Sequence, residues 1–122
     1  MKLRLLVACA VVMLAAACGS ARATEPSGGA RREVVVTIEA DTAVGFFSPA
    51  VTQVQPGGAV RFENLTLFPH NAIFGDVTIA DSTLFGDGES YVVKIPADTA
   101  DGLYTYVCTL HPGMSGTLDV QR

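Results

Sequence analysis

Four side chains in the second half of the chain have the chemistry of soft metal ligands, and three of them lie within seven residues. The motif Cys108-Thr109-Leu110-His111-Pro112-Gly113-Met114 holds the only cysteine and the only methionine that follow residue 18. The chain has two histidines, His111 in this motif and His70 far upstream. Taken singly, a cysteine or methionine usually packs in the core and a histidine is often merely exposed, without binding a metal. Together, at this spacing, they indicate one common centre.

The donor types of this set favour copper. We expect a strand to end at Cys108, a turn at Pro112-Gly113 and another strand after Met114, so that side chains three residues apart face one point. A thiolate, two imidazoles and a weak thioether are the ligands of a blue copper site. Structural zinc uses more thiolates, imidazoles or carboxylates, and an iron–sulfur cluster needs more cysteines. The set therefore predicts one type 1 copper ion.

Four protein ligands leave no open coordination position of the kind that catalytic metal sites keep. No histidine remains for a second copper centre. We therefore expect a protein that is not an enzyme, and we exclude oxidase or nitrite reductase chemistry within this chain.

The segments that must position these ligands have the pattern of β-strands. Runs of β-branched and aromatic residues are separated by turn residues, and no amphipathic helical stretch occurs. We expect strands at 33–39, 51–55, 59–64, 70–74, 90–95, 103–108 and 116–120. Seven or eight short strands predict an all-β fold, a sandwich or small barrel. Tyr104 follows a polar connection, and it either ties that connection down through its hydroxyl or is a plain core aromatic.

The ends of the chain differ in composition. Residues 1–17 combine two basic residues with an apolar run that is too short to span a bilayer, which is typical of an export signal. Cleavage is expected either after Ala23 or, as in bacterial lipoproteins, before a lipidated Cys18; the cysteine at the end of the apolar run favours the second. Residues 18–32 have the composition of a flexible tether. The folded domain is therefore expected at 33–122.

Charge and cysteine content narrow the function classes further. From Thr24 onward the chain has twelve acidic and five basic residues, a net charge of −7. No basic stripe occurs, which argues against binding of nucleic acid. Cys9 lies in the leader, so Cys108 has no partner for a disulfide within the domain.

Residues 33–122 resemble the plastocyanin/amicyanin group of cupredoxins, and the Cys-x2-His-x2-Met loop has the length found in amicyanin. Further matching motifs are Val54-x-Pro56-Gly57 before Val60-x-Phe62, Pro69-His70-Asn71, Gly102-x-Tyr104-x-Tyr106-x-Cys108 and Met114-x-Gly116. The resemblance implies a Greek-key β-sandwich. It also implies that His70, Cys108 and His111 are equatorial copper ligands and that Met114 is the axial ligand.

The same resemblance implies roles for three neighbours of the ligands. Asn71 matches the family residue whose backbone N–H bonds the thiolate and whose side chain joins the two ligand loops, here at Thr109. Leu110 stands where these relatives have proline, which lacks an N–H. Its amide could therefore give the thiolate a second hydrogen bond and raise the reduction potential.

A protein of this kind would carry single electrons outside the cytoplasm, in the periplasm or cell envelope, as a monomer that docks briefly on redox partners. Electrons would pass at His111, within an apolar patch formed by Phe68, Pro69, Leu110, Pro112 and Gly113. The alternative function is capture or delivery of copper at the cell surface. A copper-free binding module is a third hypothesis.

Overall fold

A computed structural model describes residues 32–41 and 44–122 of the 122-residue chain. The predicted export signal, both cleavage positions and Cys18 lie outside the described residues, as does the tether except for its last residue, Arg32. Within the described residues there is no helix that is long and apolar enough to cross a membrane.

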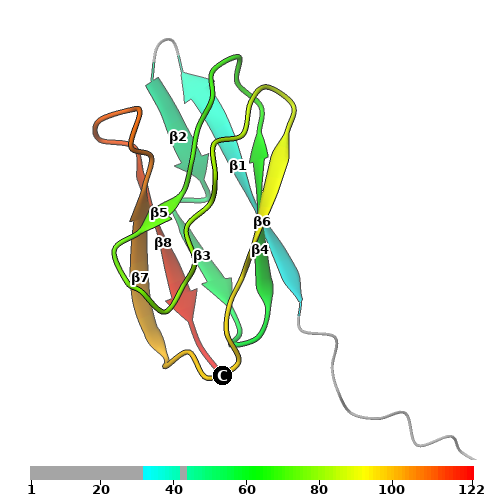
Figure 1. The fold of residues 1–122 in the computed structure, drawn as a ribbon, viewed down its shortest axis with the longest axis vertical. Helices are drawn as coiled ribbons and strands as arrows, with labels where there is room; N and C mark the ends of the chain where they lie inside the picture. The colour runs from blue at the N-terminus through cyan, green and yellow to red at the C-terminus, as the bar shows by residue number, and fades with distance from the viewer. Residues whose placement is uncertain (1–31, 42–43) are drawn as a thin grey trace, which may run out of the picture.

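The described residues form eight strands in two four-stranded sheets (Figure 1). The first sheet has the order β2-β1-β4-β6 and consists of β1 (Glu33–Asp41), β2 (Val44–Ser48), β4 (Ala59–Asn64) and β6 (Ser90–Lys94). The second sheet has the order β3-β8-β7-β5 and consists of β3 (Val51–Val54), β5 (Ile73–Phe74), β7 (Gly102–Val107) and β8 (Ser115–Val120). The pairs β1–β4 and β3–β8 are parallel, and the other pairs are antiparallel. The prediction of an all-β sandwich is confirmed.

Alternation of side chains along the strands produces the core between the sheets. On β4, Val60 and Phe62 are fully buried, whereas the alternate residues Ala59, Arg61 and Glu63 are only half-buried. The ring of Phe62 meets that of Tyr106 from β7 edge to face, with centroids 5.2 Å apart. Burying large aromatic side chains of this kind contributes roughly 2–3 kcal/mol each. This shared core holds the two sheets, and with them the loops at their ends, in fixed relation.

Two elements differ from the expectation. β2 was not among the predicted strands, because Gly45 contributes no side chain and interrupts the alternation that marks a strand. The strand expected at 70–74 is reduced to Ile73–Phe74, and His70 instead forms an isolated bridge with Phe85. The backbone of His70 is therefore paired with a loop and not with the sheet.

The connection that precedes β7 is tied down by Tyr104. Its hydroxyl donates a hydrogen bond to the backbone carbonyl of Ala100 at 3.0 Å. Of the two roles considered for this tyrosine, the structure therefore supports the tie.

Two loops that carry the predicted ligands lie at one end of the sandwich. The chain passes from β4 into the segment that contains His70, and from β7 into the loop that begins at Cys108. Figure 1 shows both loops at the end opposite the C-terminus.

Candidate metal centre

The three predicted equatorial ligands meet at this end of the molecule. Sγ of Cys108 lies 3.7 Å from Nδ1 of His70 and 3.5 Å from Nδ1 of His111. One ligand atom from each residue lies within 4.8 Å of the other two. Two donors about 2.1 and 2.3 Å from one ion, in trigonal geometry, would be about 3.8 Å apart. The spacing of the three side chains therefore fits a single trigonal metal ion.

Met114 lies beside the His70 ring. A Cβ atom placed on Gly45 would be 2.7 Å from Cε1 of His70 and 3.3 Å from Sδ of Met114, so the two side chains border the same point of β2. Met114 is 2% exposed. The thioether is thus buried next to the imidazole, as an axial ligand would require.

Burial sets the protonation of His70. This residue is 1% exposed, and removal from water lowers the pKa of its imidazole below the ordinary 6.5; the nearby His111 lowers it further. Burial disfavours the charged ring. The neutral imidazole is the form that binds a metal.

Local hydrogen bonds explain why the Cys108–Met114 loop closes on itself. The backbone N–H of Cys108 donates to the carbonyl of Met114 at 3.0 Å, and the N–H of Met114 donates to the carbonyl of His111 at 3.1 Å. Gly113 has φ of 86°, a left-handed conformation that glycine adopts at little cost. The turn expected at Pro112-Gly113 is therefore where the chain reverses toward β8.

The two ligand loops are joined by Asn71. Its Nδ2 donates to Thr109 Oγ1, and its Oδ1 accepts the backbone N–H of Thr109, both at 2.9 Å. This is the link expected from the resemblance. Because the partners are 38 residues apart in sequence, the link fixes the position of His70 relative to the Cys108 loop.

The hydrogen bonds expected from backbone N–H groups to the Cys108 sulfur are not found among the described residues. In the part of the chain that the structure describes, neither the Asn71 N–H nor the Leu110 N–H donates to Cys108 Sγ; the hydrogen-bonding atoms close to the sulfur are the two histidine nitrogens. Leu110 lies at the surface and is 46% exposed.

Exposed apolar residues lie close in sequence to the predicted ligands on both loops. Phe68 and Pro69 are exposed beside His70, whose ring centroid lies 4.5 Å from that of the half-buried His111. Leu110, Pro112 and Gly113 are exposed on the other loop. Leu65 and Leu67, which were not predicted to be exposed, are 61% and 81% exposed. Alternation with the polar Thr66 would predict buried leucines, so the sequence pattern does not indicate their exposure.

Comparison with known proteins agrees with the geometry. A family model described as copper binding proteins, plastocyanin/azurin family, matches residues 33–121. The chain belongs to this family. Its cofactor is accordingly copper, and the His, Cys, His and Met side chains gathered at one end of the sandwich are a donor set that suits it.

Individual relatives point the same way. The chain is 34% identical to plastocyanin of Scenedesmus fuscus over 101 residues, which cover 73% of this chain and 100% of the relative. It is 32% identical to amicyanin-alpha of Methylorubrum extorquens over 80 residues, 62% of this chain and 64% of the relative. The solved structure of an amicyanin mutant in its reduced Cu(I) form has a TM-score of 0.62 at 22% identity, covering 73% of this chain and 82% of that one. The cupredoxin-type sandwich expected from the sequence is thereby confirmed.

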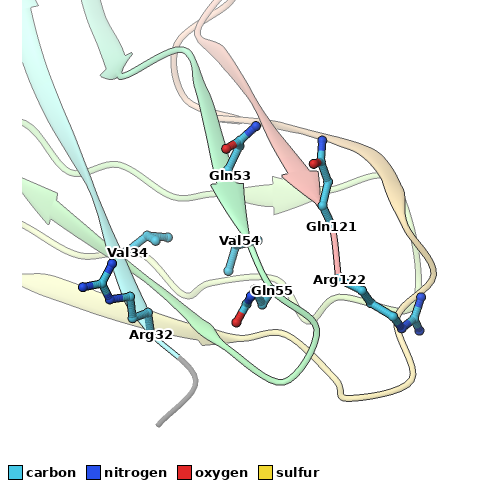
Figure 2. A pocket seen from close by; sticks show the side chains of 7 residues that line it. All are labelled: Arg32, Val34, Gln53, Val54, Gln55, Gln121 and Arg122. Carbon is cyan, nitrogen blue, oxygen red and sulfur yellow. The ribbon is translucent and has the colours of Figure 1, made fainter. Parts of the chain in front are cut away.

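A separate cavity of about 380 Å³ lies at the end of the sandwich that carries the C-terminus, and Figure 2 shows the side chains that line it. Its lining comes from the start of β1 and the ends of β3 and β8, and consists of Arg32, Val34, Gln53, Val54, Gln55, Gln121 and Arg122. It holds no thiol or imidazole, and the Arg122 guanidinium is paired with Asp101 at 2.6 Å. The described lining of this cavity therefore shares no residue with the cluster of metal-ligating side chains.

Proposed function

We propose that this chain is an exported blue copper protein that carries single electrons between redox partners. His70, Cys108 and His111 act as equatorial ligands, and Met114 is the axial ligand. The observation that carries this proposal is the convergence of three ligand atoms within 4.8 Å beside a buried thioether. Copper, when bound, supplies the Cu(I)/Cu(II) couple.

The residues around the site favour electron transfer because they are already held in place. His70 is fixed on both sides of its backbone, since its N–H donates to the Phe85 carbonyl at 3.1 Å and its carbonyl accepts from the Phe85 N–H at 3.0 Å. The Asn71–Thr109 link holds the second loop against the first. Ligands that are fixed before the electron arrives need little rearrangement when the charge of the site changes.

The exchange point in this proposal is His111. Its ring is half-buried, whereas the other three ligand side chains are buried. The exposed Phe68 and Leu110 provide an apolar surface beside it. Redox encounters use small interfaces with fast release. A monomer with this patch is suited to brief docking on partner proteins.

Delivery of copper is the alternative function, and the architecture of the site argues for retention. His70 comes from one loop and the other three ligands from another, so release of the metal requires the two linked loops to separate. Export to the periplasm or cell envelope, with cleavage after Ala23 or anchoring through a lipidated Cys18, rests on the N-terminal sequence and is part of the proposal.

A visible absorption spectrum after addition of Cu(II) tests the proposal. The mature wild-type domain should give the intense blue band of a Cu–thiolate bond, and Cys108→Ser should abolish it while the fold persists. A colourless wild type, or an unchanged band in Cys108→Ser, would overturn the assignment. Rapid transfer of copper to a Cu(I) chelator would favour delivery over electron transfer.

A further inference from the structure

The buried ring of His70 has a second nitrogen that faces away from Cys108. Nε2 lies 2.8 Å from Oγ1 of Thr66, whereas Nδ1 faces the sulfur of Cys108 at 3.7 Å. Thr66 is 5% exposed and His70 is 1% exposed, so solvent has little access to this contact. A neutral imidazole carries one N–H. A ring that offers Nδ1 to a metal therefore carries its proton on Nε2 and donates it to the Thr66 hydroxyl.

The Thr66 hydroxyl passes the hydrogen bond on to Asn64. Thr66 Oγ1 lies 2.8 Å from Asn64 Oδ1, which also accepts the backbone N–H of Thr66 at 2.9 Å. The Asn64 Nδ2 donates to the carbonyls of Phe68 at 2.7 Å and Phe85 at 3.2 Å. A flipped amide would place its N–H groups against the Thr66 N–H and its oxygen against two carbonyls. The orientation of the amide is therefore fixed, and with it the direction of the whole chain of hydrogen bonds.

This chain of hydrogen bonds is anchored in the sheet. Asn64 is the last residue of β4 and is 1% exposed. Its backbone N–H donates to the Glu89 carbonyl at 2.9 Å, and its carbonyl accepts the Gly88 N–H at 3.0 Å. The inner side of the loop between β4 and His70 is thus polar and fully paired. Its outer side carries the exposed Leu65, Leu67 and Phe68.

We propose that Thr66 and Asn64 are positioning residues of the copper centre, which hold His70 in the tautomer that leaves Nδ1 free for the metal. This inference rests on the proposed function, because the tautomer matters only if Nδ1 binds copper. An acceptor at Nε2 also makes the ligand nitrogen more basic. A more basic ligand stabilises Cu(II) relative to Cu(I), so the Thr66 hydroxyl lowers the reduction potential.

Thr66→Val tests this role, since it replaces the hydroxyl by a methyl group of similar size. It leaves the buried Nε2–H without an acceptor. We expect Cu(II) affinity to fall by about 10- to 100-fold, the range typical for loss of a hydrogen bond to a metal ligand. If Cu(I) affinity falls about tenfold less, the potential rises by about 59 mV.

Two further variants serve as controls. Thr66→Ser keeps the hydroxyl and should retain the wild-type potential and affinity. Thr52→Val makes the same exchange at a buried threonine of β3 whose hydroxyl has no hydrogen-bond partner among residues 32–41 and 44–122. It should leave both values unchanged, although it perturbs the core in a similar way.

The second measurement needs no variant. In long-range proton–nitrogen NMR spectra of the Cu(I) wild type, the His70 proton should reside on Nε2 and exchange slowly with solvent. A proton on Nδ1 would overturn the inference even if Thr66→Val fails to fold. So would a folded Thr66→Val with wild-type potential, or an equal shift in Thr52→Val. These results differ from failure of the proposed function, in which the wild type gives no blue copper site at all.

Discussion

Gly45 of β2 touches two of the proposed ligands without donating anything to the metal. A Cβ atom there would lie 2.7 Å from His70 Cε1 and 3.3 Å from Met114 Sδ, and the shorter distance is closer than real Cβ contacts allow. We expect Gly45→Ala to displace one of these side chains, to change the visible spectrum and the potential, and to cost about 1–3 kcal/mol in stability.

The matched control for this change is Gly75→Ala. A Cβ atom at Gly75 would meet no atom within 4 Å, so spectrum and stability should remain those of the wild type. Absorption spectroscopy, voltammetry and urea unfolding measure the three quantities. If Gly45→Ala kept the wild-type spectrum and potential, β2 would have to shift enough to accommodate the added Cβ atom without displacing His70 or Met114.

The lowered pKa of His70 has a consequence for the copper-free protein. Burial, and then the proximity of His111, depress the pKa of His70 in the folded state below its ordinary 6.5. The unfolded chain therefore binds more protons than the folded one once the pH drops below 6.5. Stability should be highest above that value and fall as the pH decreases from it, by at most about 1.4 kcal/mol per pH unit for one proton.

Urea unfolding of the copper-free protein between about pH 7.5 and about pH 5.5 measures this dependence, in a range above the titration of ordinary carboxylates. The variant His70→Gln lacks the titrating ring and should show a flatter dependence. An equal slope in both proteins would assign the effect to other groups.

At the scale of secondary-structure elements, the register of β7 and β8 is fixed by one pair of residues. Tyr106 lies opposite Gly116, and its ring is fully buried among the core aromatics. A Cβ atom at Gly116 would overlap Cζ and the hydroxyl oxygen of Tyr106. Because Gly116 has no side chain, the ring of Tyr106 can occupy the space next to β8.

Gly116→Ala should destabilise the protein by about 1–3 kcal/mol, because the buried ring must move within a close-packed core. Because Cys108 and Met114 flank these two strands, the visible spectrum should also change. Ser115→Ala, at an exposed position of the same strand, is the control and should be near neutral. Thermal unfolding gives the comparison, and a Gly116→Ala protein as stable as the control would contradict this account of the register.

At the scale of the whole molecule, the apolar surface near the ligands contrasts with an acidic chain. From Thr24 onward the net charge is −7, yet Leu67, Phe68 and Leu110, which are close in sequence to the ligands, are uncharged and exposed. Two copies can therefore approach through this patch with less repulsion than through the rest of the surface.

Phe68→Asp should accordingly slow electron self-exchange between oxidised and reduced copies by about tenfold or more, since like charges then meet across the contact. Added salt should restore part of the rate by screening. Leu103→Asp introduces the same charge at an exposed leucine near the other end of β7 and should have a much smaller effect. Line broadening in NMR spectra of mixed oxidation states measures the rate. If both variants slowed self-exchange equally, the result would contradict the assignment of electron exchange to this patch.

Much of this protein could be predicted from its sequence because the decisive signals are local. Cys108, His111 and Met114 fall within one turn, so their chemistry and spacing are visible without knowledge of distant contacts. Runs of β-branched and aromatic residues between turn residues likewise predicted β4 and β8, since such patterns are local.

Only the tertiary structure decided the contacts between segments far apart in the chain. That Gly45 lies against His70, and that β1 pairs with β4 in parallel, depends on how the two sheets close over their core. The role of Thr66 could not be predicted for a related reason. No sequence pattern distinguishes this threonine from other loop residues, because its hydroxyl reaches the His70 ring nitrogen only in the folded structure. The sequence thus determined which atoms could bind the metal, whereas packing determined which neighbours hold those atoms in place.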